Sequence, residues 1–242
     1  MKKRLLALAA LSIVAASTVA RADDPVQHPP VPISVQKILA PAGFDSNDEA
    51  EVILDGYLPS TCWRLSHNTA TVEQATGAIE ITQYARQTNG PCLPAKVPFT
   101  SEAAIGLLPA GQYRVSARGA PSRVLHIVAA TVSGLDDFLY APVDAVRVEV
   151  DQAAGGYVAT LTGRLTNSCL VWDDVKVLDQ GDVVVLLPVL KAADIATCAT
   201  DTAEIEFKRQ VPLPTGMMSG RHLLHVRSLN GKAVNTMFKV GT

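Results

Sequence analysis

Four cysteines divide the sequence into two matching parts. Cys62 and Cys92 are 30 residues apart, and Cys169 and Cys198 are 29 residues apart. Four cysteines can pair in three ways. The similar separations favour the pairs Cys62–Cys92 and Cys169–Cys198, because the chain then contains two copies of one design. We therefore expect a repeat with one internal disulfide in each copy.

A shift of 107 residues aligns the two copies. It places three positions of the first copy on identical residues of the second: Gly56 on Gly163, Leu58 on Leu165 and Cys62 on Cys169. Apolar and more polar residues alternate over residues 50–58 and again, with the same phase, over residues 157–165. Alternation of period two indicates a strand with one buried face, and a slip of one residue would turn its apolar side chains to water. The shared phase predicts equivalent strands.

The rest of each copy also reads as short strands separated by turns. Asn230-Gly231 is a strong two-residue hairpin signal, residues 183–190 are rich in β-branched side chains, and long amphipathic helical patterns are absent. The chain length of 242 residues leaves room for two domains of ordinary size. The predicted fold class is all-β, with two tandem immunoglobulin-like β-sandwich domains, each holding one internal disulfide.

The N-terminus has the features of an export signal. A basic start at residues 2–4 precedes an apolar stretch that ends in Ala20-Arg21-Ala22, which supplies small residues at a cleavage site. An N-terminal membrane anchor would instead need about 20 apolar residues and would lack a cleavage site of small residues. The expected organisation is a signal peptide at 1–22, a proline-rich lead-in at 23–31, domain 1 at 32–132, a linker at 133–142 and domain 2 at 143–242. We expect a periplasmic or secreted protein.

Removal of the signal peptide would make the chain more acidic. The formal net charge of −2 becomes −6, since four basic residues and no acidic ones are lost. A chain of this charge without a basic cluster is a poor partner for nucleic acids. The longest later apolar run, residues 183–190, has eight residues and includes Pro188, so no membrane span is expected in the mature chain.

Each predicted disulfide has a tryptophan close to it. Trp63 follows Cys62 directly, and Trp172 lies three residues after Cys169. Such odd offsets place two side chains on opposite faces of an extended strand. We therefore predict Trp63 and Trp172 as core aromatics and expect the sulfur atoms near a strand end or a sheet edge.

Residues 43–65 and the later segments NGPCLPAKVPF and LLPAGQYRV carry a family resemblance. The chain resembles uncharacterised exported proteins of Gram-negative bacteria with repeated immunoglobulin-like sandwich domains. The pattern consists of Gly56, Leu58-Pro59, Cys62 and Gly111-x-Tyr113-x-Val115. The second copy departs from it, with Thr166 in place of Pro59 and His222 in place of Tyr113. The resemblance implies export and a sandwich fold, and it carries no information about an activity.

Two clusters offer ligands of the kinds that metal ions prefer. Met217 and Met218 precede His222-x-x-His225, which suggests copper, although this spacing puts the two imidazoles on opposite faces of a strand. The segment Asp45 to Glu49 is rich in oxygen ligands for calcium, and it reads equally as a polar turn before a strand. The simpler interpretations predict no metal and no cofactor, and the calcium question stays open.

Motifs for catalysis are absent from the sequence. It has no G-x-S-x-G elbow, no H-E-x-x-H and no phosphate-binding glycine loop. All four cysteines are assigned to disulfides, and the adjacent carboxylates Asp136-Asp137 and Asp173-Asp174 read as turn caps. We assign no catalytic residue and predict that the protein is not an enzyme.

The functional expectation is a non-catalytic binding protein whose partner is another protein or peptide in the cell envelope. Candidate surfaces are loops at the sandwich ends, a groove around residues 135–143 and an exposed strand edge. One alternative is an inhibitor of envelope or secreted peptidases that presents the loop from Thr88 to Pro98, tethered by Cys92. A second alternative is a hydrolase with a scattered site. A fimbrial chaperone fits less well, because the two domains of such chaperones differ from each other. Sugar binding also fits less well, because aromatic residues are scarce.

Overall fold

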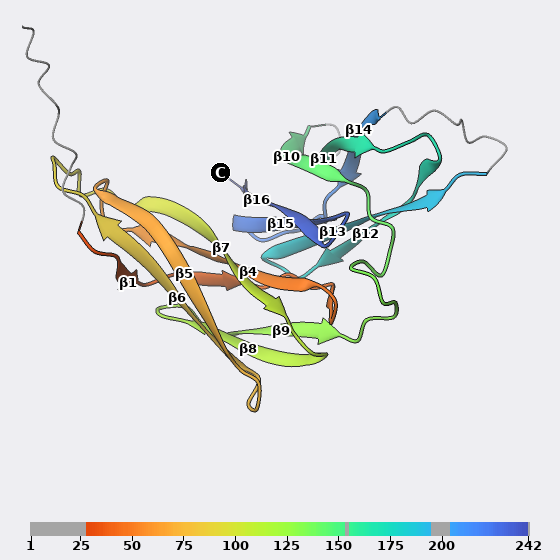
Figure 1. Ribbon diagram of the computed structural model, residues 1–242. Coiled ribbons are helices and arrows are strands. Elements are labelled where there is room, and N and C mark those ends of the chain that lie inside the picture. The colour runs from red at the N-terminus through yellow and green to blue at the C-terminus, as the bar shows by residue number, and fades with distance from the viewer. Residues whose placement is uncertain (1–27, 153–154, 195–203, 242) are drawn as a thin grey trace, which may run out of the picture.

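The computed structural model describes residues 28–152, 155–194 and 204–241 of the chain. Within these ranges the regular structure consists of sixteen β-strands, so the predicted all-β class is confirmed (Figure 1). No helix in the described part of the chain could span a membrane. The predicted signal peptide at 1–22 and residue Cys198 lie outside the described residues.

The N-terminal half contains nine strands in two facing sheets. They are β1 (Val31–Ile33), β2 (Lys37–Leu39), β3 (Phe44–Asp45), β4 (Glu49–Leu58), β5 (Trp63–Glu73), β6 (Ala78–Gln87), β7 (Val97–Leu107), β8 (Gly111–Ala117) and β9 (Arg123–Val128). One sheet has the order β2-β4-β7; the other has β5-β6-β8-β9-β3, with β1 pairing with β6 beside β8. Alternate residues of β4, such as Val52 and Leu54, pack against Ile79 and Ile81 of β6 in one buried core.

The C-terminal half contains seven strands, again in two facing sheets. They are β10 (Val143–Asp151), β11 (Gly156–Leu165), β12 (Leu170–Asp179), β13 (Val183–Ala192), β14 (Ile205–Pro212), β15 (Gly220–Ser228) and β16 (Lys232–Val240). The sheets have the orders β10-β11-β14 and β12-β13-β15-β16. Ala159 and Leu161 of β11 meet Val184 and Leu186 of β13 in a second core. The pairings follow the same order as β2-β4-β7 and β5-β6-β8-β9.

Each half contains an equivalent parallel pair, β6–β8 and β13–β15, and the N-terminal half has a second one, the short pair β3–β9. Strand β7 crosses to the opposite sheet between β6 and β8, so the chain reverses twice and β8 runs in the direction of β6. Strand β14 has the same role between β13 and β15. Immunoglobulin domains have antiparallel sheets, so the expected immunoglobulin-like topology differs from the structure at these pairs. Alternation along one strand cannot show the direction of its neighbour.

The glycines that the shift of 107 aligned occupy equivalent places. Gly56 of β4 lies opposite Phe99 of β7, and Gly163 of β11 lies opposite Phe207 of β14. A Cβ atom on Gly56 would lie 2.9 Å from the Phe99 ring, and one on Gly163 would lie 2.8 Å from the Phe207 ring. In both halves the absence of a side chain makes room for the phenyl ring on the neighbouring strand.

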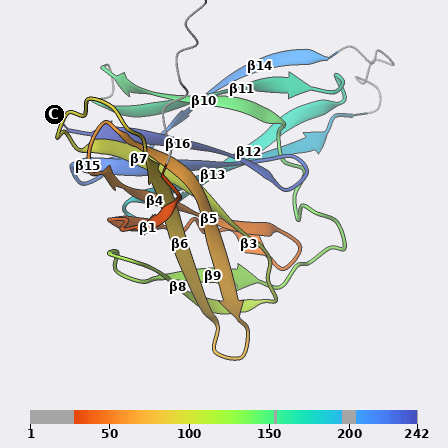
Figure 2. The same ribbon diagram turned by 60° about the vertical axis from the view of Figure 1, so that its left-hand side comes forward.

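A third apolar cluster joins the two halves. Leu39 of β2 and Ile53 of β4 pack against Val183, Val185 and Leu223 of the C-terminal half. In Figure 2 the sheet β10-β11-β14 lies at the top and β8 and β9 lie at the bottom, with the contacting sheets between them. Strand β13 is therefore covered on both faces, which explains why residues 183–190 form an unbroken apolar run.

The predicted disulfide between Cys62 and Cys92 is confirmed. Cys169 is also disulfide-bonded, and its predicted partner Cys198 lies outside the described residues. Trp63 and Trp172 are partly buried and pack against the first and second cores, respectively. Cys62 directly precedes β5, so its sulfur lies at a strand end.

The strand bounds locate the predicted lead-in and linker. Val31, at the end of the predicted lead-in, already belongs to β1. The predicted linker at 133–142 lies in the connection between β9 and β10, where Tyr140 and Ala141 are buried. Tyr140 forms an isolated bridge with Val189, so the end of this connection is part of the packed structure.

Candidate functional site

The connection between β6 and β7 combines full exposure with covalent anchoring. Residues 89–96 are all exposed, and Cys92 among them is bonded to Cys62 with a Cα–Cα distance of 5.4 Å. Closing a chain segment of this length stabilises a fold by about 3.5 kcal/mol in the chain-entropy model. The disulfide thus ties an otherwise exposed segment to the start of β5.

Hydrogen bonds fix this loop on both sides of the disulfide. The amide of Leu93 donates to Thr61 Oγ1 at 3.0 Å, and its carbonyl accepts from the Thr61 amide at 3.2 Å. On the other side, the amide and the hydroxyl of Thr88 both donate to the Cys62 carbonyl, at 3.0 and 3.1 Å. Pro94 further restricts Leu93 to extended conformations. The loop is held in one shape.

The fixed loop presents one large apolar side chain. Leu93 is 67% exposed although its backbone is fully hydrogen-bonded. Binding to a pre-ordered group avoids the entropy cost of ordering a loop in the complex. We name residues 88–96 the anchored loop and treat Leu93 as its contact residue.

A buried ion pair joins the two halves at another place. Arg227 of β15 pairs with Asp48, and both side chains are almost fully buried. The guanidinium of Arg227 lies 5.4 Å from the ring centre of Phe44 and 5.5 Å from that of Tyr140. Asp136 lies 4.0 Å from the same guanidinium. Every partner of Arg227 comes from outside its own sheet, so this group fastens the halves together.

The segment Asp45 to Glu49, for which the sequence left calcium binding open, takes part in this contact through Asp48. The Asp45 amide donates to Asp48 Oδ2 at 2.8 Å, and the Asn47 amide donates to Asp45 Oδ1 at 2.7 Å. These bonds form the polar turn that the sequence offered as the alternative. Among the described residues no group of three His, Cys, Asp or Glu side chains is arranged to hold a metal ion.

A second polar cluster at the interface brings together residues from four strands. Asn235 of β16 donates its amide hydrogens to Glu51 of β4 at 2.7 Å and to Glu102 of β7 at 3.3 Å. Its carbonyl oxygen lies 2.8 Å from Nδ1 of the fully buried His225 of β15. No spacing in the sequence links these positions, because only the docking of the two halves brings them together.

The cluster perturbs its two titratable members in opposite directions. Burial, together with the neighbouring carboxyl of Glu102, raises the pKa of Glu51 to about 7 although the Asn235 bond lowers it. Burial lowers the pKa of His225 to about 4 although the bond to Asn235 raises it. His225 is therefore neutral near pH 7, and the acid pair tolerates close approach because Glu51 retains a proton over part of the pH range.

The histidines and methionines considered for copper do not converge. His222 places its two ring nitrogens 3.0 Å from the Gly181 carbonyl and 2.6 Å from the Met218 carbonyl. His225 bonds to Asn235 and faces the N-terminal half. Met217 packs against the second core, whereas the Met218 side chain is exposed. The structure brings His222 into contact with a Met218 backbone atom only.

Asp136, Asp173 and Asp174, which belong to the adjacent carboxylates predicted as turn caps, each have a hydrogen-bond or ion-pair partner in the structure. Asp136 accepts from the amides of Asn230 and Gly231 at 2.7 and 2.9 Å, so it caps the β15–β16 turn. Asp173 pairs with Lys191 at 2.8 Å, and Asp174 accepts from the Val175 amide at 2.8 Å.

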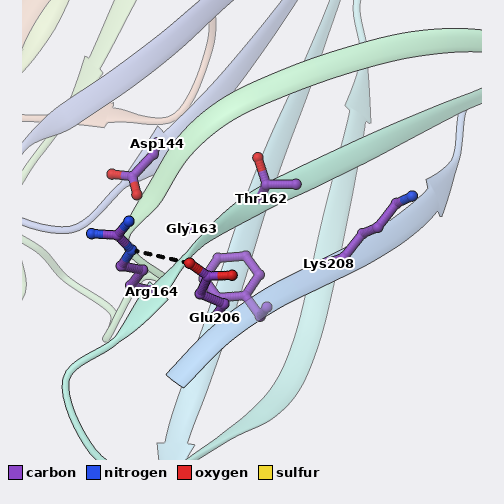
Figure 3. A pocket seen from close by; sticks show the side chains of 7 residues that line it. Asp144, Thr162, Gly163, Arg164, Glu206 and Lys208 are labelled. Carbon is purple, nitrogen blue, oxygen red and sulfur yellow. Dashed lines mark ion pairs between the residues drawn. The ribbon is translucent and has the colours of Figure 1, made fainter. Parts of the chain in front are cut away.

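The outer face of the β10-β11-β14 sheet is hollowed and charged. Asp144, Arg164, Glu206 and Lys208 are among the residues that line a hollow of about 450 Å³, and Figure 3 shows these side chains with Arg164 facing Glu206. Arg164 lies 3.7 Å from Glu206, so charges of opposite sign face each other on this surface. This pairing reduces the net charge that the surface offers a ligand, and we consider the anchored loop the stronger candidate site.

The comparisons with known proteins support the sandwich fold of the N-terminal half. Residues 52–126, from β4 into β9, match the family model of the ORF11 beta-sandwich domain. This match includes Cys62 and Cys92, the two cysteines of the disulfide that ties the anchored loop to the start of β5. No curated protein and no solved structure matches the chain.

Proposed function

We propose that this protein is a non-catalytic binding protein that presents Leu93 of its anchored loop to an apolar pocket of another protein. One observation carries the proposal: an exposed leucine is held rigidly by a disulfide and by both of its own backbone groups. Exposed apolar groups on ordered segments are typical of binding surfaces.

The proposal includes export and a duplicated design. Disulfides are stable in periplasmic and extracellular environments, and the structure contains the Cys62–Cys92 bond. The signal-peptide pattern at 1–22 supports the same compartment. The matching strand orders and the equivalent pairs Gly56–Phe99 and Gly163–Phe207 support a tandem of two related sandwich domains.

The peptidase-inhibitor alternative is less compatible with the backbone of the loop. An inhibitor that binds like a substrate offers its carbonyl to the oxyanion hole of the enzyme and pairs its backbone with an enzyme strand. Thr61 occupies both the amide and the carbonyl of Leu93. The leucine side chain is therefore free to bind a pocket, while its backbone is not free to bind a cleft.

The hydrolase alternative would draw on titratable side chains such as the cluster of Glu51, Glu102 and His225. His225 is fully buried between the two halves, so its imidazole has no direct contact with a substrate in solution. The same side chains fasten the interface through Asn235. We favour a structural role for them.

Site-specific photo-crosslinking tests the proposal. The full-length protein would carry a photo-reactive residue at position 93 or, as a matched control, at position 107, since Leu107 at the end of β7 is similarly exposed at 62%. In an envelope extract we expect a discrete adduct from position 93 and none of that mass from position 107. Excess unlabelled protein should compete for the adduct, and the Leu93→Asp variant should not. Equal labelling from both positions, or none from position 93, would contradict the proposal.

A further inference from the structure

The connection between β9 and β10 exposes an unusual number of large apolar side chains. Four of them lie in this connection, Val132, Leu135, Phe138 and Leu139, and a fifth, Val128, ends β9 directly before it. Leu135 is 57% exposed and Phe138 is 42% exposed. Apolar side chains scattered singly over a surface are ordinary, whereas a cluster of this kind marks a contact surface.

Hydrogen bonds hold the backbone of this connection in place. Its apolar side chains are therefore exposed on an ordered segment. Asn47 donates its side-chain amide to the carbonyls of Val132 and Gly134 at 2.8 and 2.9 Å. The Thr131 amide donates to Asp137 Oδ1 at 3.1 Å, and the Leu190 amide donates to the Leu139 carbonyl at 2.7 Å. Polar groups therefore tie the connection to both halves, and apolar groups face outward.

The exposed side chains border a hollow of about 400 Å³ against the β15–β16 turn. Its apolar lining comes from Leu135, Phe138, Leu139 and Leu229, and its polar lining comes from Asp136, Asp137 and Asn230. Ligand pockets in proteins commonly measure about 300–1,000 Å³. The Phe138 ring lies 6.1 Å from the buried Tyr140 ring, so the hollow continues the apolar interface between the halves.

Negative charge accumulates beside this hollow. Asp136 and Asp137 belong to its lining, and Asp48 lies beside Tyr140, where it is paired with Arg227. Besides Arg227, Lys176 places a positive charge here, with its Nζ atom 4.2 Å from the centre of the Phe138 ring. A second copy of this chain would bring the same acids to the contact, so charge complementarity favours a basic partner.

We infer that the hollow binds an extended segment of another protein in which aliphatic side chains alternate with lysine or arginine. The aliphatic groups would contact Leu135 and Phe138, and a cationic group would approach Asp137. Figures 1 and 2 both place this connection and the anchored loop at opposite ends of the molecule. The inference is therefore independent of Leu93, and the two surfaces could engage two partners at once.

Fluorescence anisotropy with short synthetic peptides tests the inference on the full chain. The probe is an acetylated, labelled peptide of alternating leucine and lysine; the comparison peptides replace lysine by glutamate or leucine by serine. We expect the leucine–lysine peptide to bind at micromolar concentration and each comparison peptide to bind at least tenfold more weakly. Equal binding of the leucine–glutamate or the serine–lysine peptide would overturn the inference.

Variants locate the binding to the hollow. Asp137→Asn keeps an oxygen acceptor for the Thr131 amide and removes the charge, so it should weaken binding about fivefold, which corresponds to about 1 kcal/mol. Phe138→Ser should weaken it at least tenfold, and Leu135→Ser serves as a second apolar variant if Phe138→Ser folds poorly. Leu107→Ser is the matched control and should leave the affinity unchanged. An unchanged affinity in Asp137→Asn and in a folded apolar variant would refute the location.

Discussion

Tyr113 and His222 make the same backbone contact in the two halves of the molecule. The Tyr113 hydroxyl donates to the Pro109 carbonyl at 2.9 Å, and Nε2 of His222 lies 2.6 Å from the Met218 carbonyl. In both cases the acceptor lies four residues upstream, before β8 in one half and before β15 in the other. The replacement of tyrosine by histidine, which looks like a departure from the repeat, preserves the contact.

The contact predicts a measurable loss in Tyr113→Phe. This variant keeps the buried ring and removes one hydrogen bond, so the free energy of unfolding should fall by about 1 kcal/mol. Urea denaturation of the purified protein provides the measurement. Tyr57→Phe is the control, because the Tyr57 side chain is exposed and its change should remain below about 0.5 kcal/mol. Equal effects of the two variants would show that the Tyr113 bond adds nothing.

The sequence predicted those features that depend on local order. Alternation identified β4 and β11, and cysteine spacing identified the Cys62–Cys92 bond. The sequence contained no sign of the contact between Glu51 and Asn235, because those residues come from strands of different halves. It also missed the parallel pairs, since strand direction depends on crossovers. The unbroken apolar run of β13 was the one available sign that a second layer covers that strand.

The aligned glycines should differ in how well they tolerate a methyl group. In Gly56→Ala the new Cβ meets mainly the edge of the Phe99 ring, and overpacking of this kind costs about 1–3 kcal/mol. In Gly163→Ala it would also clash with the Pro142 carbonyl oxygen, so the loss should be larger. Gly156→Ala is the control, since nothing lies within 4 Å of its Cβ position. Thermal melting should rank the losses as Gly163→Ala, Gly56→Ala, Gly156→Ala, and any other order would contradict the packing argument.

The ion pair of Arg227 and Asp48 should be costly to break from one side only. Arg227→Met leaves the Asp48 carboxylate buried without its counter-ion, and such changes cost about 3–5 kcal/mol. Replacing Asp48 by Asn in the same chain should recover part of this loss, because the most deeply buried of the carboxylates beside Arg227 is then neutral. Urea denaturation of the two single variants and the double variant measures the coupling. Additive losses would mean that the two side chains do not depend on each other.

The opposite shifts of Glu51 and His225 should make the combined contribution of these two groups to the stability of the wild-type protein nearly independent of pH over their shared range. The folded state retains the Glu51 proton up to about pH 7, whereas the unfolded state releases it near 4.5, so this group stabilises the fold at low pH and the effect fades as pH rises. Folding keeps His225 neutral down to about pH 4, whereas the unfolded state binds a proton near 6.5, so its effect has the opposite sign. Between about pH 4.5 and 6.5 the two contributions oppose each other.

Replacing one of these two residues should therefore reveal the pH dependence that the other gives to the free energy of unfolding. In Glu51→Gln the free energy of unfolding should rise by a few kcal/mol between pH 4.5 and 6.5, as the unfolded state loses its His225 proton. In His225→Gln it should instead fall between pH 4.5 and 7, as the unfolded state releases its Glu51 proton while the folded state keeps it. The sign of each slope, measured by urea denaturation at a series of pH values, is informative even if both variants are less stable at every pH. Slopes of the same sign in the two variants would contradict the compensation, because a shared direction requires that another group controls the titration of the interface.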